Sequence, residues 1–147
     1  MADLPGSVLF ACTTNAVRSP MAEAIMKFLY GHLVYADSAG VRGDRINPFA
    51  VAVMDEIGID LSRHRPKTIV DLEDTSYDVV ISLSPQAQHH AVELTRTMAC
   101  EVVYWPTFDA TVVVGNRETR IAAFREVRDG LMERIKDRFP SAPSPVP

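Results

Sequence analysis

Apolar residues alternate along the chain between short unbroken runs and stripes with helical spacing. Residues 7–11 form a short apolar run closed by polar residues, which indicates a buried parallel strand. Pro20 then stands where the first turn of a helix tolerates proline, and a helix is predicted over residues 21–30. Its apolar residues fall on one helical face: Met21, Ile25, Phe28 and Leu29. The start of the chain is therefore predicted to be strand, loop and helix.

The same alternation continues through the first half of the chain. A second strand is expected at residues 33–36, followed by a charged, glycine-containing loop over residues 37–46. Asn47 is a suitable helix N-cap, Pro48 fits the first helical position, and the helix is expected to stop at Gly58. The polar stretch that follows has no pattern that determines its local structure.

The second half of the chain repeats the unit. A third buried strand is predicted at residues 77–83, and Ser84 with Pro85 opens another helix. A fourth strand is predicted at residues 101–104, followed by a long loop over residues 105–116. The closing helix is marked by apolar residues at helical spacing: Ile121, Phe124, Val127, Leu131 and Ile135.

Strands that alternate with helices predict an α/β fold, a doubly wound four-stranded parallel sheet with helices on both faces. The 147 residues, 47% of them hydrophobic, suffice for one compact core. We expect a single domain over residues 1–139 and a disordered Pro/Ser tail at residues 140–147. Ligands of such folds bind beyond the carboxyl ends of the strands, and Cys12 lies at such an end.

Composition excludes several classes of protein. The net charge of −4 argues against a nucleic-acid binder. No apolar run approaches the roughly 18 residues that span a bilayer, and no signal peptide is recognisable, so we expect a cytoplasmic protein without membrane contact. The two cysteines, Cys12 and Cys100, have no CxxC spacing, so we expect neither a disulfide framework nor a metal site, and no cofactor.

The segment from Cys12 to Ser19 combines groups that suit phosphoryl transfer. A loop between a strand and a helix N-terminus gathers free N–H groups and the positive end of the helix dipole, which bind an oxyanion. Arg18 adds a planar guanidinium suited to phosphate. The same field favours a cysteine thiolate, to which Ser19 could donate a hydrogen bond. The alternative for Cys12 is a buried core thiol.

These residues resemble the loop of the low-molecular-weight protein tyrosine phosphatases. That family carries Cys, five residues, Arg and Ser after its first strand, and here the segment reads CTTNAVRSP followed by MAE. The resemblance continues through ADSAG at 36–40, NPFAVAVMDEIGIDLSRHR at 47–65 and YDVVISL at 77–83. It implies a phosphomonoester hydrolase that forms a cysteinyl-phosphate intermediate, acts on a phosphorylated protein or aryl phosphate, and holds inorganic phosphate or another oxyanion.

The resemblance also assigns roles to residues. Cys12 would be the nucleophile, Arg18 would stabilise the transition state, and Asp109 would be the general acid. Ser38 would support Asn15, which holds the loop in its unusual conformation. The implied substrate-binding residues are Thr13, Thr14, Asn15, Ala16, Val17 and Ser19.

The sequence departs from the family pattern at several positions. Ala110 replaces the proline that commonly follows the acid, so Asp109 could instead be a solvated loop residue or part of a turn before a helix. Thr14 replaces a glycine, and Val17 replaces a second cysteine. The segments at 40–46 and 110–114 lack the aromatic residues that surround phosphotyrosine. The first segment instead carries three charged residues: Arg42, Asp44 and Arg45.

These charges are either ordinary solvated loop residues or a mouth that favours acidic phosphosubstrates. Two other functions stay open. Thioredoxin-linked arsenate reductases share the fold and loop, but their relay needs further cysteines, and residues 83–85 here contain none. A catalytically weak binder of phosphate or phosphoprotein is the other alternative. A cysteine protease is disfavoured because no histidine has a recognisable context: His32, His64, His89 and His90.

Overall fold

The computed structural model describes residues 4–72 and 76–139 of the chain. The tail predicted at residues 140–147 lies outside the described residues. None of the helices in the described ranges is long and apolar enough to cross a membrane. The elements follow in this order: β1 (Ser7–Cys12), α1 (Arg18–Tyr30), β2 (Tyr35–Gly40), α2 (Pro48–Asp55), β3 (Val79–Ser82), α3 (Pro85–Leu94), β4 (Glu101–Tyr104), the short 3₁₀ helix η1 (Ala110–Val112) and α4 (Arg117–Arg138).

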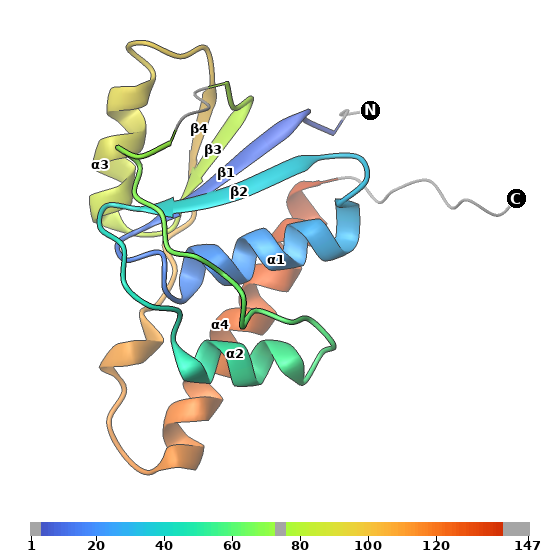
Figure 1. Cartoon of the computed structure of the whole chain (residues 1–147), viewed down its shortest axis with the longest axis vertical. Helices are drawn as coiled ribbons and strands as arrows, with labels where there is room; N and C mark the ends of the chain where they lie inside the picture. The colour runs from blue at the N-terminus through green and yellow to red at the C-terminus, as the bar shows by residue number, and fades with distance from the viewer. Residues whose placement is uncertain (1–3, 73–75, 140–147) are drawn as a thin grey trace, which may run out of the picture.

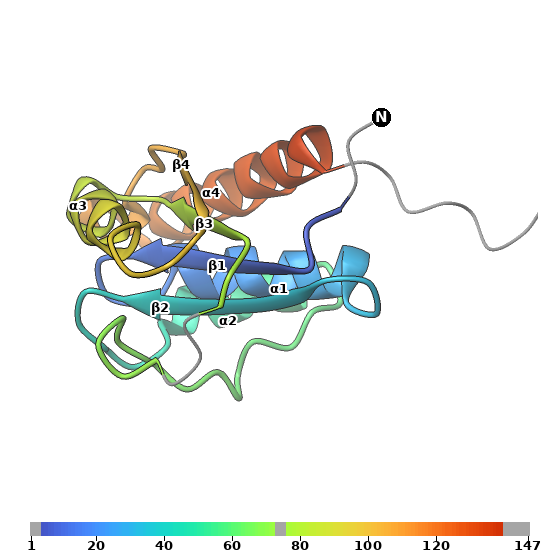
Figure 2. The same cartoon turned by 90° about the horizontal axis from the view of Figure 1, so that it is seen from above.

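The strands form one parallel sheet of four strands in the order β2-β1-β3-β4 (Figure 1). In Figure 1 the strands lie between α3 on one side and α1 on the other. Figure 2 shows α4 running beside α1, and these two helices are in contact. The predicted α/β fold, a doubly wound parallel sheet covered on both faces, is confirmed.

Successive residues of β1 supply the two halves of the core, because side chains of a strand point alternately to opposite faces. Val8 and Phe10 join the larger cluster, which contains the buried faces of α1 and α4. Leu9 joins a smaller cluster with Val80 of β3 and Ala91 of α3. The central strand is therefore buried on both faces, as its unbroken apolar run predicts.

The second strand lies later in the chain than the sequence pattern predicts. β2 covers residues 35–40 rather than 33–36, so the expected loop at 37–46 begins only after Gly40. Asp37 and Ser38 look like loop residues, yet both are buried. Their polar atoms are hydrogen-bonded inside the protein, Asp37 to Tyr77 and Ser38 to Glu23, which removes the cost of burying them.

Helix α1 differs from the other α-helices at its N-terminus. Side chains of Asn47, Ser84 and Asn116 cap α2, α3 and α4 by accepting a backbone N–H. Val17 occupies the same position before α1 and provides no such hydrogen bond. The first N–H groups of α1 are therefore left for a ligand, at the place where the chain leaves β1.

The loops that follow β1 and β3 meet at the edge of the sheet where the strand order reverses. From β1 the chain passes to β2 on one side, and from β2 it crosses to β3 on the other. The two loops contact each other, since Thr13 Oγ1 lies 3.0 Å from Ser84 Oγ. Such a switch point is where ligands bind in open α/β sheets.

Candidate active site

The sulfur of Cys12 lies at the end of β1, under the loop that leads to α1. Cys12 is buried, with 1% of its surface exposed. Ser19 Oγ lies 2.8 Å from the sulfur, and the backbone N–H of Asn15 donates to it at 3.2 Å. Both groups are placed to donate a hydrogen bond to the sulfur.

The direction of the hydrogen bonds around Asn15 leaves the Ser19 proton for the sulfur. Nδ2 of Asn15 donates to Ser19 Oγ and to Ser38 Oγ, each at 2.9 Å. Each hydroxyl thereby accepts from the amide and keeps its own proton for another partner. Ser38 donates to Glu23 Oε1 at 2.5 Å, and Ser19 is left to donate to Cys12.

Asn15 holds the loop in a left-handed backbone conformation with a φ of 54°. Asparagine tolerates this region better than other residues with a side chain. Its Oδ1 accepts hydrogen bonds from Lys67 N at 2.8 Å and His64 Nε2 at 2.9 Å. Thr14, which replaces a glycine of the family pattern, does not have a positive φ. The loop therefore needs no glycine at that position.

His64 is a site residue that the sequence analysis missed. Because Asn15 Oδ1 can only accept, His64 Nε2 must carry a proton and act as the donor. Desolvation by burial holds the pKa of His64 below its ordinary value. The imidazole faces Asn15 rather than the sulfur of Cys12, so it does not form the Cys–His pair of a protease. No local pattern around residue 64 could have revealed this role, because its partner lies 49 residues away.

The lowered pKa of His64 predicts how stability depends on pH. The unfolded chain takes up a proton near pH 6.5 while the folded protein resists it, so the free energy of unfolding should fall as the pH drops below about 6.5. Urea unfolding between pH 5 and 7.5 measures this slope. A His64→Gln variant should flatten the slope. An unchanged slope in that variant would show that other groups cause it.

Successive backbone hydrogen bonds join the segment after β2 to the loop between β1 and α1, residues 13–17, which is the predicted phosphate loop. Arg42 N donates to Thr13 O at 2.9 Å and Asp44 N donates to Thr14 O at 3.0 Å. Val41 and Asn47 make the same kind of bond to the carbonyls of Cys12 and Ala16. The segment 41–47 therefore forms a fixed wall beside the loop that surrounds the sulfur.

Gly40 permits this close approach. A Cβ atom at this position would lie 2.4 Å from Arg42 O and 2.7 Å from Asn15 N, which are backbone atoms that cannot easily move. We predict that Gly40→Ala lowers the free energy of unfolding by roughly 1–3 kcal/mol, measured by urea unfolding. The matched control is Gly130→Ala in α4, where a Cβ would meet nothing within 4 Å. That variant should be neutral or stabilising, and equal losses in both variants would contradict the account.

The loop opens into a polar cavity of ≈ 480 Å³. Arg18 lies at its edge, where Nη1 donates to Thr107 O at 3.0 Å and Nη2 lies 3.5 Å from Thr13 Oγ1. The predicted residues Cys12, Asn15 and Ser19 are buried at the loop. The residues that line the cavity are Thr13, Thr14, Ala16, Val17, Arg18, Arg42, Asp44, Arg45, Asn47, Gln86, Asp109 and Thr111.

Asp109 reaches the cavity from the loop after β4. Its Oδ1 accepts hydrogen bonds from Thr111 N at 3.0 Å and from Thr111 Oγ1 at 2.6 Å, so it caps the short helix η1. Among the described residues, no hydrogen bond engages Oδ2. Asp109 therefore belongs to a turn before a helix, which is one of the alternatives that the sequence leaves open. It also lines the cavity, as a general acid would.

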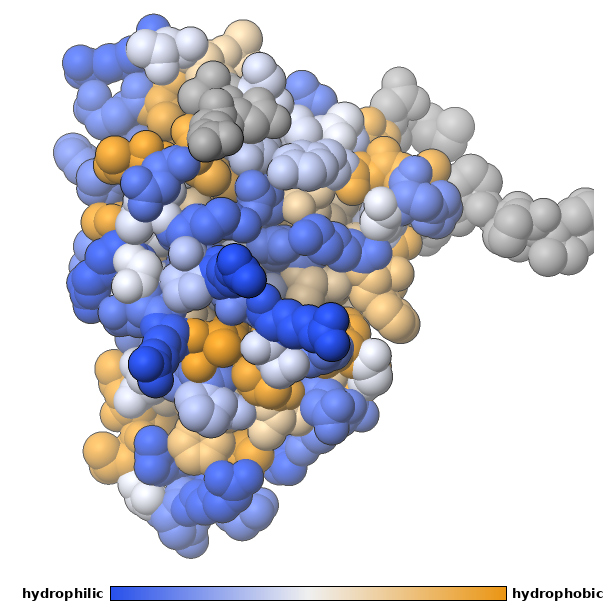
Figure 3. All heavy atoms as spheres, viewed as in Figure 1, coloured by the Kyte–Doolittle hydropathy of each residue, from blue (hydrophilic) through white to orange (hydrophobic). Residues whose placement is uncertain are grey.

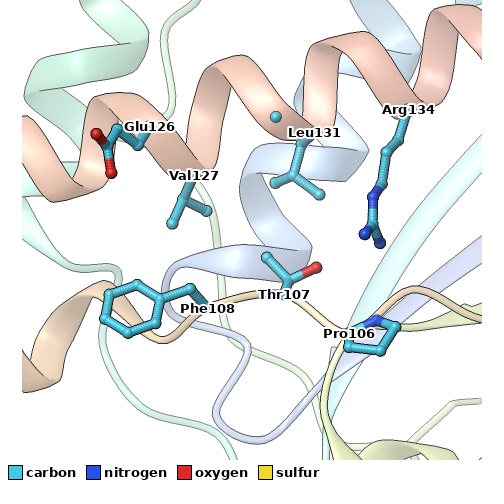
Figure 4. A pocket seen from close by; sticks show the side chains of 8 residues that line it. Pro106, Thr107, Phe108, Glu126, Val127, Leu131 and Arg134 are labelled. Carbon is cyan, nitrogen blue, oxygen red and sulfur yellow. The ribbon is translucent and has the colours of Figure 1, made fainter.

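A second, smaller cavity of ≈ 220 Å³ lies between the loop after β4 and helix α4. Figure 4 shows Phe108 and Thr107 on one side of it and Val127 and Leu131 on the other. It shares its loop with the polar cavity, but none of the phosphate-loop residues lines it. The larger cavity is therefore the candidate active site.

Cys100 lies far from this site. It precedes β4 at the amino edge of the sheet, where Glu101 pairs with Val79, whereas Cys12 ends β1 at the carboxyl edge. It packs against the smaller core cluster, on the opposite face of the sheet from Cys12. Burial raises the pKa of its thiol. The fold therefore keeps the two sulfurs apart.

A comparison with known proteins matches most of this chain to one protein family. The family described as low molecular weight phosphotyrosine protein phosphatase matches residues 7–140. An arsenate reductase of Halalkalibacterium halodurans is 36% identical over 131 residues, which cover 88% of this chain and 91% of that protein. Arsenate reductases of this group are thus similar in sequence across most of their length.

Solved structures show the same similarity. A mutant of YwlE from Bacillus subtilis has a TM-score of 0.74 and 25% identity, and the match covers 90% of this chain and 95% of that one. A structure described as an arsenate reductase in the phosphate binding state has a TM-score of 0.68 and 28% identity over the same shares. The neighbours thus include a protein whose structure binds phosphate.

Proposed function

Because this chain belongs to the low molecular weight phosphotyrosine protein phosphatase family, we propose that it hydrolyses phosphate monoesters through a cysteinyl-phosphate intermediate on Cys12. The observation that supports this most is the arrangement around the sulfur. Two hydrogen-bond donors face the sulfur of Cys12. The loop that follows Cys12 leads to the uncapped N-terminus of α1. Arg18 stands at the edge of the cavity above. This combination suits a nucleophile that attacks a bound dianion.

In the first step the thiolate of Cys12 attacks phosphorus. The S–P bond forms and the P–O bond to the leaving group breaks. Backbone N–H groups of the loop and the guanidinium of Arg18 hold the equatorial oxygens, whose negative charge they stabilise. Asp109 gives a proton to the leaving oxygen, so the product departs as a neutral alcohol or phenol.

In the second step water attacks the cysteinyl phosphate. The carboxylate of Asp109 takes a proton from that water, the new P–O bond forms, and the S–P bond breaks. Cys12 leaves as a thiolate, which the Ser19 hydroxyl and the Asn15 N–H stabilise. The same two donors therefore assist the attack and the departure of the sulfur.

Asp109→Asn should lower the rate in a way that depends on the leaving group. A phenoxide of low pKa leaves without help, so kcat/KM for an activated aryl phosphate, which reports formation of the intermediate, should fall little. An unactivated ester should lose roughly 10²–10⁴-fold in kcat/KM. The measurement is a series of aryl and alkyl phosphates with leaving groups of rising pKa.

The matched control is Asp44→Asn, because Asp44 lines the same cavity on the segment joined to the phosphate loop. This variant should show no dependence on the leaving group. An equal loss across all leaving groups in Asp109→Asn would remove Asp109 from the role of general acid.

The substrate class is a separate question within the family. Phosphotyrosine is the substrate that the family's description names. No aromatic residue is among those that line the polar cavity in the described part of the chain. We propose phosphorylated proteins as substrates, and phosphotyrosine as one of the residues to test.

Reduction of arsenate is the second candidate, favoured by the names of similar proteins. Arsenate has the shape and charge of phosphate, so Cys12 could attack it in the same cavity. Reduction of arsenate to arsenite takes two electrons, which are released when a second thiol attacks the sulfur of Cys12 and forms a disulfide with it. Cys100 lies at the opposite edge of the sheet, and the sequence holds no third cysteine. This function would therefore need thiols supplied by another protein or a small thiol.

One assay distinguishes these functions. The purified protein is tested for phosphate release from p-nitrophenyl phosphate and phosphopeptides, and for arsenate reduction with thioredoxin or glutaredoxin. We expect phosphate release, with arsenate as a competitive inhibitor. Arsenite formation without phosphate release would establish the second function. Phosphate binding with neither reaction would show a non-catalytic binder.

A further inference from the structure

We propose that three exposed arginines at and beside the mouth of the cavity bind acidic side chains next to the phosphorylated residue of a polypeptide substrate. These residues form the basic rim: Arg42, Arg45 and Arg65. The inference rests on the proposed phosphatase function and names the substrate class that this site prefers. It concerns residues that the chemistry itself does not use.

The first half of the rim is held rigidly at the mouth of the site. Arg42 and Arg45 lie on the segment whose N–H groups bond to the carbonyls of the phosphate loop. Both line the polar cavity together with Arg18, and both are exposed. Their backbone is fixed before a substrate arrives, so little ordering of the segment is needed on binding.

The second half lies on a neighbouring loop, residues 62–67. Backbone hydrogen bonds join the two loops, from Gly40 N to Lys67 O at 2.8 Å and from Ile69 N to Gly40 O at 2.9 Å. A Cβ atom on Gly43 would lie 3.4 Å from Cβ of Pro66. Arg65 therefore stands beside the segment that carries Arg42. Figure 3 shows the most hydrophilic side chains of this face gathered at its centre, over these loops.

Few acidic side chains lie close enough to the arginines of the basic rim to form a salt bridge. Within the described residues, no salt bridge within 4.0 Å involves Arg45 or Arg65. Arg42 meets only Asp44, at 3.9 Å. Other acidic groups around these loops are Asp109 in the cavity, Asp37, which pairs with Lys67 at 2.5 Å, and Asp60, which accepts a hydrogen bond from Ser62 N.

Two arginines on α4 show what close pairing looks like in this fold. Arg125 and Arg128 each meet Glu56 at 2.8 Å. The whole chain carries a net charge of −4. The positive rim is therefore a local feature of the mouth rather than a reflection of a basic protein, and it attracts anions to the place where the phosphate enters.

The layout of the rim favours a polypeptide over a small phosphate ester. A single phosphoryl group held in the loop above Cys12 would leave Arg45 without a carboxylate partner and Arg42 with only its distant contact to Asp44. Arg65 lies on the neighbouring loop. A chain with carboxylates on both sides of its phosphorylated residue can pair with both loops at once. The described residues that line the cavity include no aromatic ring, so charge is the means of selection that this lining offers.

The test compares matched phosphopeptides that differ only in the flanking residues, with Asp and Glu in one and Ser and Asn in the other. We expect kcat/KM to be roughly 10-fold higher for the acidic peptide at low salt, mostly through KM. The preference should shrink in 0.5 M salt, since screened surface charges interact weakly. Replacing Arg42, Arg45 and Arg65 together with glutamine should abolish the preference, as each exposed pair contributes roughly 1.5- to 5-fold. Arg96→Gln is the control, because this exposed arginine follows α3, far along the chain from both loops.

The outcomes separate this inference from the proposed function. If wild-type protein releases no phosphate from p-nitrophenyl phosphate, the phosphatase proposal fails. If it does so but treats both peptides alike, only the basic rim proposal fails. A preference that survives the triple substitution, or that Arg96→Gln also removes, would place its origin elsewhere. Stronger competition by single-stranded RNA than by an acidic peptide of equal charge would also overturn the proposal.

Discussion

Replacing Cys12 by serine is expected to lower kcat by roughly 10⁴-fold or more, because a serine hydroxyl is far harder to ionise than a thiol. The two side chains are nearly the same size, so the loop should keep its shape. Phosphate affinity should therefore stay close to that of the wild type. Steady-state kinetics with p-nitrophenyl phosphate measure the rate, and calorimetry measures the binding of inorganic phosphate.

The matched control is Cys100→Ser, which removes the other thiol of the chain at the opposite edge of the sheet. It should leave the rate near the wild-type value. Near-normal turnover in Cys12→Ser would end the covalent mechanism. A large loss of kcat in both variants would mean that Cys100 also takes part in turnover, which would contradict a mechanism that uses Cys12 alone.

Arg18→Lys is expected to reduce kcat by roughly 10²–10³-fold although the positive charge stays. A guanidinium offers two parallel N–H groups to two phosphoryl oxygens, whereas an ammonium offers a single point of contact. Arg18 also bonds to Thr107 O, so its plane is set by the loop that carries Asp109. The rate with p-nitrophenyl phosphate measures the effect.

Arg134→Lys is the control for this substitution, since Arg134 lines the smaller cavity and not the polar one. It should leave kcat unchanged within about twofold. A kcat near the wild-type value in Arg18→Lys would mean that Arg18 does not contact the phosphoryl group. The phosphate-binding role would then fall on the backbone N–H groups alone.

Much of the fold could be predicted because its core strands carry simple patterns. Residues 8–11 are apolar throughout since β1 is buried on both faces, and the strand predicted at 101–104 matches β4. The sequence pattern predicts β2 too early in the chain because Asp37 and Ser38 look like loop residues. Only their partners, which come from distant parts of the chain, allow them to be buried in a strand.

The candidate site also contains both residues that the sequence pattern predicts and residues that it does not. Cys12, Arg18 and Ser19 lie within one short segment, so their spacing alone suggested their chemistry. His64 and Glu23 stabilise that segment through Asn15 and Ser38, and no local pattern joins them to it. The sequence therefore predicts the residues of the short reactive segment. It does not predict the residues from distant parts of the chain that hold this segment in place.

The covalent intermediate is the central claim, and rapid acid quenching tests it most directly. The protein is mixed with an aryl phosphate, quenched within milliseconds, digested and analysed by mass spectrometry. A phosphoryl group should be found on the peptide that contains Cys12, and Asp109→Asn should increase its amount because that variant slows the attack of water. Full turnover with no phosphorylated peptide, or with the phosphoryl group on another residue, would contradict the account.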